Sequence, residues 1–229
     1  NISARLTFSN SLIKEEHLGD RKCNALCDMF NVYDNCKTSQ NGVIIYSDLL
    51  LEYIKERYPK LYFVSSTTKV ITDFHKFTGE LNREDFRYAV LDFRLNKQFE
   101  KLGNIQEELK DKVEFLCNEC CSFYCTDRKN CYENVSRKAL GEDVEDHICK
   151  SPDAGCGYMF SKAMENPGFI GTEDIKNIYL PMGFENFKIE GRSLGSAMIL
   201  EFLLYYMTKP ECRLRVREMI YLDSSLDLF

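Results

Sequence analysis

The sequence predicts an α/β protein in which parallel strands form a TIM-type barrel, incomplete or irregular, with helices on the outside. Short β-branched or aromatic runs alternate with helical segments along the chain, as in repeated strand–helix units. The runs are almost continuously apolar, which is typical of parallel strands buried on both faces. They also end in polar residues, and in a barrel those ends meet on one face. No G-x-G-x-x-G follows the first run, which favours a barrel over an open, doubly wound sheet.

Six strands can be read in order along the chain. The expected strands are residues 4–10, 41–48, 61–68, 88–96, 113–116 and 186–192. The second strand–helix unit is the clearest, because Ser47 or Asp48 can cap a helix and Pro59 lies just past its end. The other expected helices lie around residues 23–29, 99–112, 194–206 and 211–222.

An eight-stranded barrel needs two more strands than these patterns supply. We expect one of them before Asn1 and another near residues 169–175. Residues 140–168 combine Gly, Pro and acidic residues with little periodicity, and we expect them to form a long, cysteine-bearing loop. At 229 residues, the whole chain from 1 to 229 is expected to be a single barrel domain.

Charge and cysteine usage limit the classes of function. The net charge is −6 with a pI near 5.3, which argues against a broad nucleic-acid-binding surface, so RNA is not favoured as a partner. No apolar run approaches the roughly 18 residues that a membrane helix needs. The chain has 11 cysteines, an odd number, and it is large enough to fold without disulfides, so we expect reduced thiols and a cytoplasmic location.

Five of the cysteines gather directly after the strand at 113–116. They are Cys117, Cys120, Cys121, Cys125 and Cys131. Packing alone seldom requires such a density, whereas metal or iron–sulfur chemistry does. Cys121 and Cys125 are spaced C-x3-C where a strand ends and a helix begins, so their thiols can converge on one metal.

The remaining ligands of such a site are left open by the spacing. Cys149 or Cys156, both in the long loop, can supply a third thiolate. Cys117 and Cys120 form a C-x2-C pair, although Cys117 can equally point into the barrel as a core residue. The spacing also fits a zinc ribbon built from Cys117, Cys120 or Cys121, Cys125 and Cys131.

Polar side chains at the ends of two strands are the candidate catalytic groups. After the last strand, Glu190 can act as an acid or base and Arg192 as an anion clamp. Asn118 and Glu119 stand in the same position after the preceding strand. An internal salt bridge at the rim of the barrel explains these residues equally well.

Two motifs resemble those of a known family. The first is N-E-x-C-x3-C-x2-R-x3-Y, which here comprises Asn118, Glu119, Cys121, Cys125, Arg128 and Tyr132. The second is F-K-I-E-G-R at 187–192, with Gly183 ahead of it. Together they resemble the collagenase-like peptidase family, whose members are TIM-barrel proteins called peptidases of unassigned catalytic type. The segments at 41–59 and 65–69 are similar to a bacterial branch of it.

The resemblance implies an iron–sulfur protein. Its better-understood members hold a [4Fe–4S] cluster with four cysteines and carry out oxygen-independent hydroxylation of a nucleobase or of a small aromatic substrate. Carried over to this chain, Cys121 and Cys125 match two ligands, and Cys149 or Cys156 matches a later one. Relatives usually have His where this chain has Cys131. The fourth ligand is not identified in this sequence, and a partner chain can supply it.

Two alternatives remain beside the redox enzyme. One is a metal-dependent peptidase or hydrolase, with zinc at the same cysteines activating a water molecule. The sequence offers little for a peptidase without metal, since it contains no H-E-x-x-H and no visible nucleophile and base pair. The other is a non-catalytic binding module in which a structural metal fixes the long loop to the barrel.

Overall fold

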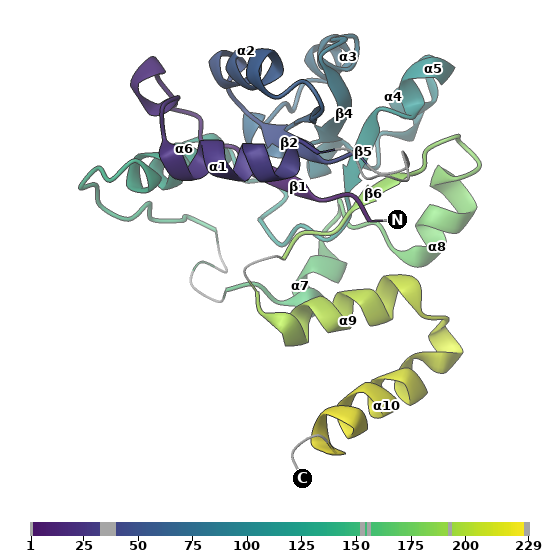
Figure 1. Ribbon diagram of the computed structural model, residues 1–229. Coiled ribbons are helices and arrows are strands. Elements are labelled where there is room, and N and C mark those ends of the chain that lie inside the picture. The colour runs from purple at the N-terminus through teal and green to yellow at the C-terminus, as the bar shows by residue number, and fades with distance from the viewer. Residues whose placement is uncertain (1, 33–39, 152–153, 155–156, 192–193, 227–229) are drawn as a thin grey trace.

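The protein is seen here in a computed structural model that describes residues 2–32, 40–151, 154, 157–191 and 194–226. Six parallel strands form one sheet, in which their spatial order follows the chain. The strands are β1 (Arg5–Phe8), β2 (Gly42–Ile45), β3 (Tyr62–Ser65), β4 (Phe86–Leu91), β5 (Val113–Leu116) and β6 (Asn186–Lys188). The sheet curls into half of a barrel (Figure 1). Within the described residues β1 pairs with β2 alone and β6 with β5 alone, so the barrel does not close.

Alternate residues of each strand face opposite sides of the sheet, as a β-strand requires. On β2, Val43 and Ile45 pack on the helical side, whereas Ile44 packs on the inner side. The inner cluster joins Ile44 to Val64, Val90 and Leu116 on the neighbouring strands. Because both sides are apolar, these strands are covered on both faces, as the sequence predicts.

An ion pair across the concave face shows how strongly the sheet curls. Arg5 on β1 and Glu114 on β5 form a salt bridge, although four strand-to-strand steps separate them. In a flat sheet those strands would lie about 19 Å apart, beyond the reach of two side chains. Lys188 on β6 also faces the same carboxylate, with its Nζ 3.6 Å from Glu114 Oε1. These charged side chains therefore link both edges of the sheet through its interior.

Helices cover the convex side and both ends of the sheet (Figure 1). The helices between strands are α1 (Arg21–Phe30), α2 (Asp48–Arg57), α3 (Phe74–Leu81), α4 (Phe99–Gly103), α5 (Glu107–Lys110), α6 (Arg128–Ala139), α7 (Phe160–Glu165) and α8 (Thr172–Asp174). After β6 come α9 (Ser196–Met207) and α10 (Arg213–Leu226). Shorter turns are η1 (Glu15–His17), η2 (Thr67–Lys69), η3 (Phe93–Leu95), η5 (Pro210–Cys212) and the π-helical turn η4 (Ile175–Tyr179).

Side-chain caps set the starts of the early helices. Asp20 accepts the Cys23 N–H at 2.8 Å, and Asp73 accepts the Lys76 N–H at 2.8 Å. Of the two residues proposed to cap the second helix, Ser47 is the cap, and it accepts the Leu50 N–H at 3.4 Å. Each cap satisfies a backbone donor that has no partner inside its helix.

The strand expected near residues 169–175 is absent, and that prediction was wrong. Residues 172–174 form α8, and the chain continues into η4. The physical reason is local capping: Asp174 Oδ2 accepts the Gly171 N–H at 3.0 Å and so starts a helical turn. The place beside β5 is taken by β6 instead. The stretch expected to be a loop, 140–168, also contains α7.

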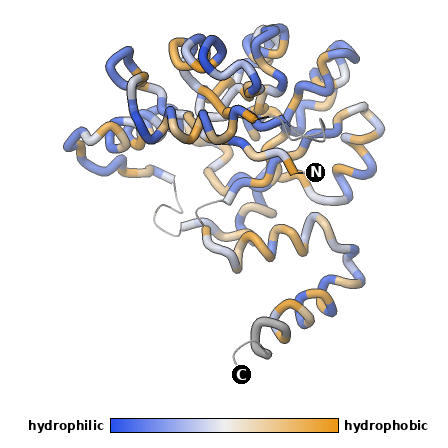
Figure 2. Tube along the Cα trace, in the orientation of Figure 1, coloured by the Kyte–Doolittle hydropathy of each residue, from blue (hydrophilic) through white to orange (hydrophobic). Residues whose placement is uncertain are grey.

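The last two helices extend from the sheet toward the C-terminus, and α10 lies farthest from the strands (Figure 1). In Figure 2, α9 is pale to orange along its length, whereas blue and orange residues alternate along α10. Phe202 and Leu204 of α9 are buried. None of the helices in the described part of the chain is long and apolar enough to cross a membrane.

Candidate active site at the open end of the half-barrel

A side chain extends the pairing of β5 and β6 beyond the last strand residues. Asn118 Nδ2 donates to the Glu190 carbonyl oxygen at 3.2 Å, and Asn118 Oδ1 accepts the Glu190 N–H at 2.8 Å. The side-chain amide of Asn118 thus makes the two hydrogen bonds that a backbone peptide group would make if the strand pairing continued. Tyr158 holds Asn118 in turn, because its Oη accepts from Asn118 Nδ2 at 2.9 Å and donates to the Asn118 carbonyl oxygen at 2.8 Å. This network places Glu190 beside the end of β5.

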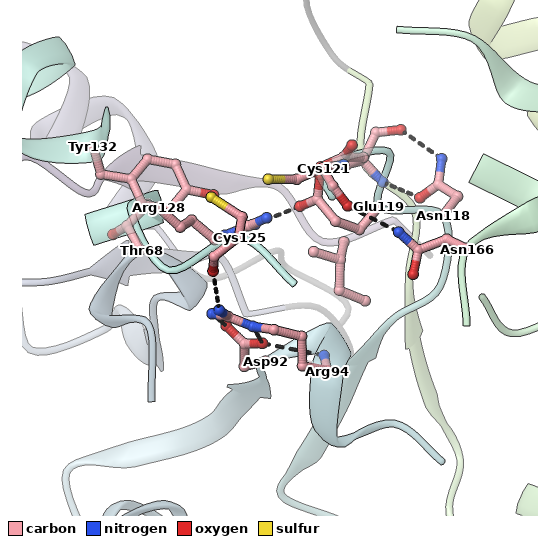
Figure 3. A network of polar contacts seen from close by, with 12 residues as sticks. Thr68, Asp92, Arg94, Asn118, Glu119, Cys121, Cys125, Arg128, Tyr132 and Asn166 are labelled. Atoms are coloured by element: carbon pink, nitrogen blue, oxygen red, sulfur yellow. Dashed lines mark hydrogen bonds and ion pairs between the residues drawn. The ribbon is translucent and has the colours of Figure 1, made fainter. Parts of the chain in front are cut away.

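Two carboxyl groups and one arginine lie next to this link, and Figure 3 shows Glu119 and Arg128 beside Asn118. Glu119 and Arg128 form a salt bridge in which the two residues are only 7% and 4% exposed. Glu119 Oε1 also accepts the Cys121 N–H at 2.9 Å. Arg128 Nη2 donates to Tyr132 Oη at 2.7 Å, one helical turn along α6. The Glu119 carboxylate is therefore fixed in place by Arg128, and Arg128 is positioned in turn by its hydrogen bond to Tyr132.

Glu190 completes the cluster and behaves differently from Glu119. Its carboxyl group lies close enough to the Glu119 carboxyl group and to the Cys120 N–H for both to influence its pKa. Burial, and then the nearby charge of Glu119, raise the pKa of Glu190 to about 8, although Arg128 opposes the shift. Near neutral pH Glu190 consequently keeps its proton for most of the time, and it is the group that can give the proton up or take it back.

The cysteine segment after β5 is held by side chains that bind its carbonyl oxygens (Figure 3). Arg94 Nη1 donates to the Cys125 carbonyl oxygen at 2.8 Å, and Asn166 Nδ2 donates to the Cys121 carbonyl oxygen at 2.9 Å. Arg94 is fixed by the buried Asp92, to which it donates from Nε at 2.7 Å and from Nη2 at 2.8 Å. Asp92 and Arg94 thus connect the end of β4 to this segment.

The thiols predicted as metal ligands lie in different environments. Burial raises the pKa of Cys121 to about 11, while the neighbouring Arg128 lowers it. Burial, followed by the charge of Cys149, raises the pKa of Cys131. Cys125 contributes to the shifts of both Cys121 and Cys131, so Cys121, Cys125, Cys131 and Cys149, called the rim thiols below, lie near one another. Cys149 itself is exposed.

Two cysteines of the segment serve packing rather than the rim. Cys117 is fully buried and packs in the core on the helical side of β5, together with Phe115. The alternative that made it a core residue is confirmed, but it points to the helical side rather than into the barrel, because alternation along β5 turns Leu116 inward and Cys117 outward. Cys120 is partly buried, and its thiol donates to the Met159 carbonyl oxygen at 3.7 Å.

Two further predicted site residues, Cys156 and Arg192, lie outside the described residues. Among those that the structure does describe, no group of three or more His, Cys, Asp or Glu side chains is placed to hold a metal ion. The predicted catalytic residues Asn118, Glu119 and Glu190 are brought together, by contrast, as the preceding hydrogen bonds show.

A cavity of about 1110 Å³ opens beside the carboxyl cluster. Its inner wall is formed by side chains of four strands, Thr7, Ile44, Leu116 and Lys188. The segment between β1 and α1 also lines it, as do hydroxyl groups after β3 and on α6 together with Glu190 and Tyr132. This volume is large enough for a small organic molecule, and the carboxyl ends of parallel strands are where barrel enzymes bind their substrates.

Arg128 and Tyr132 are part of this site, although neither was assigned a role from the sequence alone. Both belong to the motif that carries the family resemblance, and their spacing of four puts them on one face of α6. That spacing is the signal that could have found them. Asn166 and Tyr158 carry no comparable signal, because their contacts join residues 40 or more positions apart.

The comparisons with known proteins add no relative to this description. No family model, no curated protein and no solved structure matches the chain.

Proposed function

We propose that the protein is an enzyme that binds a small organic molecule in the half-barrel cavity and transfers a proton at Glu190. The observation that carries this proposal is that Glu190 lines the cavity and has the salt-bridged carboxyl group of Glu119 as a close neighbour. A carboxyl group whose pKa lies near the working pH is suited to general acid–base catalysis. A carboxyl group that only forms a structural ion pair can lie anywhere in the protein, whereas a catalytic acid or base must line the cavity that binds the substrate.

Each residue of the cluster has a defined part in proton transfer. The salt bridge with Arg128 holds the Glu119 side chain in place. The charge of Glu119 then raises the pKa of Glu190, so Glu190 keeps its proton to a higher pH. Asn118 fixes the Glu190 backbone, which limits the directions in which its carboxyl group can point. The apolar wall of Ile44 and Leu116 excludes water from one side of a bound molecule.

The proposal is tested by solvent exchange. The protein is incubated in deuterated water with a panel of small metabolites, and mass spectrometry follows deuterium entering carbon-bound positions. We expect exchange with the wild-type protein and a loss of 10²-fold or more in the Glu190→Gln variant, as is typical when a general base is removed. The matched control is Glu185→Gln, because Glu185 is exposed in the same segment. Equal exchange by Glu190→Gln and wild type refutes the role of Glu190.

The rim thiols favour a second element of the proposal, the [4Fe–4S] cluster that the family resemblance implies. Cys121, Cys125, Cys131 and Cys149 supply sulfur, which is the donor that iron–sulfur clusters and zinc prefer. With a cluster, the protein would be a TIM-type barrel enzyme of redox chemistry, and oxygen-independent hydroxylation of a nucleobase-like or small aromatic molecule would be its reaction. The described thiols provide the donor atoms without closing a four-thiolate centre, so no step is assigned to the cluster.

Metal analysis separates this element from its alternatives. The protein is purified without oxygen, and iron, sulfide and zinc are counted per chain together with an absorption spectrum. About four irons with broad absorption support the cluster. One zinc without colour supports a hydrolase or a structural metal, and removing the metal then distinguishes loss of activity from loss of folding. No metal in the anaerobic protein leaves the acid–base centre as the whole proposed function.

A further inference from the structure

Tyr132 presents an unused hydrogen-bond donor at the mouth of the cavity. Its hydroxyl oxygen accepts a hydrogen bond from Arg128 Nη2 at 2.7 Å. A phenol has one proton, and an oxygen that already accepts from a guanidinium must direct that proton elsewhere. No acceptor for it is found among the residues that the structure describes. Tyr132 lines the cavity, so its hydroxyl group is a candidate donor to a molecule bound there.

The environment of this hydroxyl makes it a stronger donor than an exposed tyrosine. Arg128 is 4% exposed and pairs with Glu119, so its positive charge is held against the phenol oxygen. A hydrogen bond from a cation polarises the O–H bond behind it, and low local polarity strengthens the effect.

The position of Tyr132 relative to Glu190 defines what the donor can do. Both residues line the same cavity, and they are close enough to interact electrostatically. Tyr132 therefore offers a hydrogen-bond donor, and Glu190 a transferable proton, to the same bound molecule. An oxygen atom that gains negative charge when a neighbouring atom loses a proton would use both groups at once.

We propose that Tyr132 donates a hydrogen bond to a carbonyl oxygen of the substrate, next to the carbon atom that exchanges its proton with Glu190. This inference rests on the proposed acid–base function and names its substrate class. The step balances: the carboxylate takes a proton from carbon, the C–H electron pair forms a C=C bond, and the C=O electrons move to oxygen. The resulting oxyanion is stabilised by Tyr132 until Glu190 returns the proton to carbon. No electron is gained or lost.

The test uses 4-nitrophenol as a probe, because its anion resembles the proposed oxyanion and absorbs differently from the neutral form. We expect the wild-type protein to bind the anion in preference to the neutral phenol. The Tyr132→Phe variant should bind it roughly tenfold or more weakly, as expected for the loss of one hydrogen bond to a charged group. The matched control is Tyr124→Phe, because Tyr124 is 83% exposed on the neighbouring cysteine segment. It should bind the probe like wild type.

A second variant protects the test against misfolding. Replacement of Tyr132 by a fluorinated tyrosine keeps the shape and makes the hydroxyl a stronger donor, so binding of the anion should tighten. Equal binding by the wild-type, Tyr132→Phe and fluorinated proteins overturns the role of Tyr132, as does a wild-type protein that prefers the neutral phenol. Either result leaves deuterium exchange at Glu190 unaffected, so failure of this inference is distinguishable from failure of the proposed function.

Discussion

Replacing Glu190 by glutamine should remove a specific pH dependence of stability. In the folded protein the pKa of Glu190 is about 8, against an ordinary value of 4.5. Between those two values the folded chain keeps a proton that the unfolded chain has released. Stability conferred by this proton is fully present below pH 4.5 and is lost as the pH rises through about 8. Glutamine has no proton to lose, so the variant should lack this decline.

The size of the effect follows from proton linkage. One proton bound by the folded state alone changes the free energy of unfolding by at most about 1.4 kcal/mol per pH unit. Partial exposure of Glu190 and its sharing of charge with Glu119 reduce the slope below that limit. At pH 9 the Glu190 carboxyl group of the wild-type protein is mostly ionised in a buried place, and Glu190→Gln should then be more stable than wild type.

The assay is urea unfolding at a series of pH values. The chain contains no tryptophan, so circular dichroism is a more suitable signal than intrinsic fluorescence at long wavelength. Glu185→Gln serves as the control, since an exposed carboxyl group should leave the pH profile parallel to that of wild type. The reasoning is refuted if the Glu190→Gln profile runs parallel to wild type between pH 4.5 and 8.

Three further substitutions test the fold. Arg5→Met should cost about 3 kcal/mol of unfolding free energy, the low end for a broken buried pair, because Glu114 keeps a second cation nearby. Phe115→Ala should cost about 3–5 kcal/mol, since this ring is fully buried in the largest core cluster. Gly168→Ala should be strongly destabilising, because an added Cβ would lie 2.4 Å from the Phe93 carbonyl oxygen. Chemical denaturation measures all three.

Matched variants sharpen these expectations. Arg87→Met removes an exposed arginine of β4 and should cost less than about 1 kcal/mol. Gly79→Ala lies within α3 with open space around the new methyl group, so it should stabilise the protein by up to about 1 kcal/mol. An Arg5→Met protein as stable as Arg87→Met would contradict the role given to the salt bridge across the sheet. Similar effects at Gly168 and Gly79 would contradict the close packing around Gly168.

The sequence predicted those parts of the fold that depend on neighbouring residues. The six strands, their parallel direction and the Ser47 cap follow from apolar runs and local capping, and the structure confirms them. Closure of the barrel depends on whether β1 meets β6, which no local pattern contains. The expected strand near 169–175 fails for a related reason, since Asp174 makes a helical turn that outweighs the β-favouring Phe169 and Ile170.

The candidate site shows the same division. Residues that follow strand ends, such as Asn118, Glu119 and Glu190, were expected at one face because parallel strands end there. Less of the thiol arrangement could be predicted. A C-x3-C spacing keeps Cys121 and Cys125 near each other, but it does not determine where cysteines that are distant in the sequence lie. Cys117 was misplaced by one step of the strand period, and one step turns a side chain to the other face.

The salt bridge between Arg5 and Glu114 also has a consequence for the order in which the chain folds. Its partners are 109 positions apart, so the sheet has no such tie until β5 has been synthesised. The strand units from β1 to β4 can pair as each follows the last, which keeps most contacts local and fast to form. Bending of the sheet must wait for a long loop closure. The concave face, and with it the cavity, should therefore be among the last features to appear during folding.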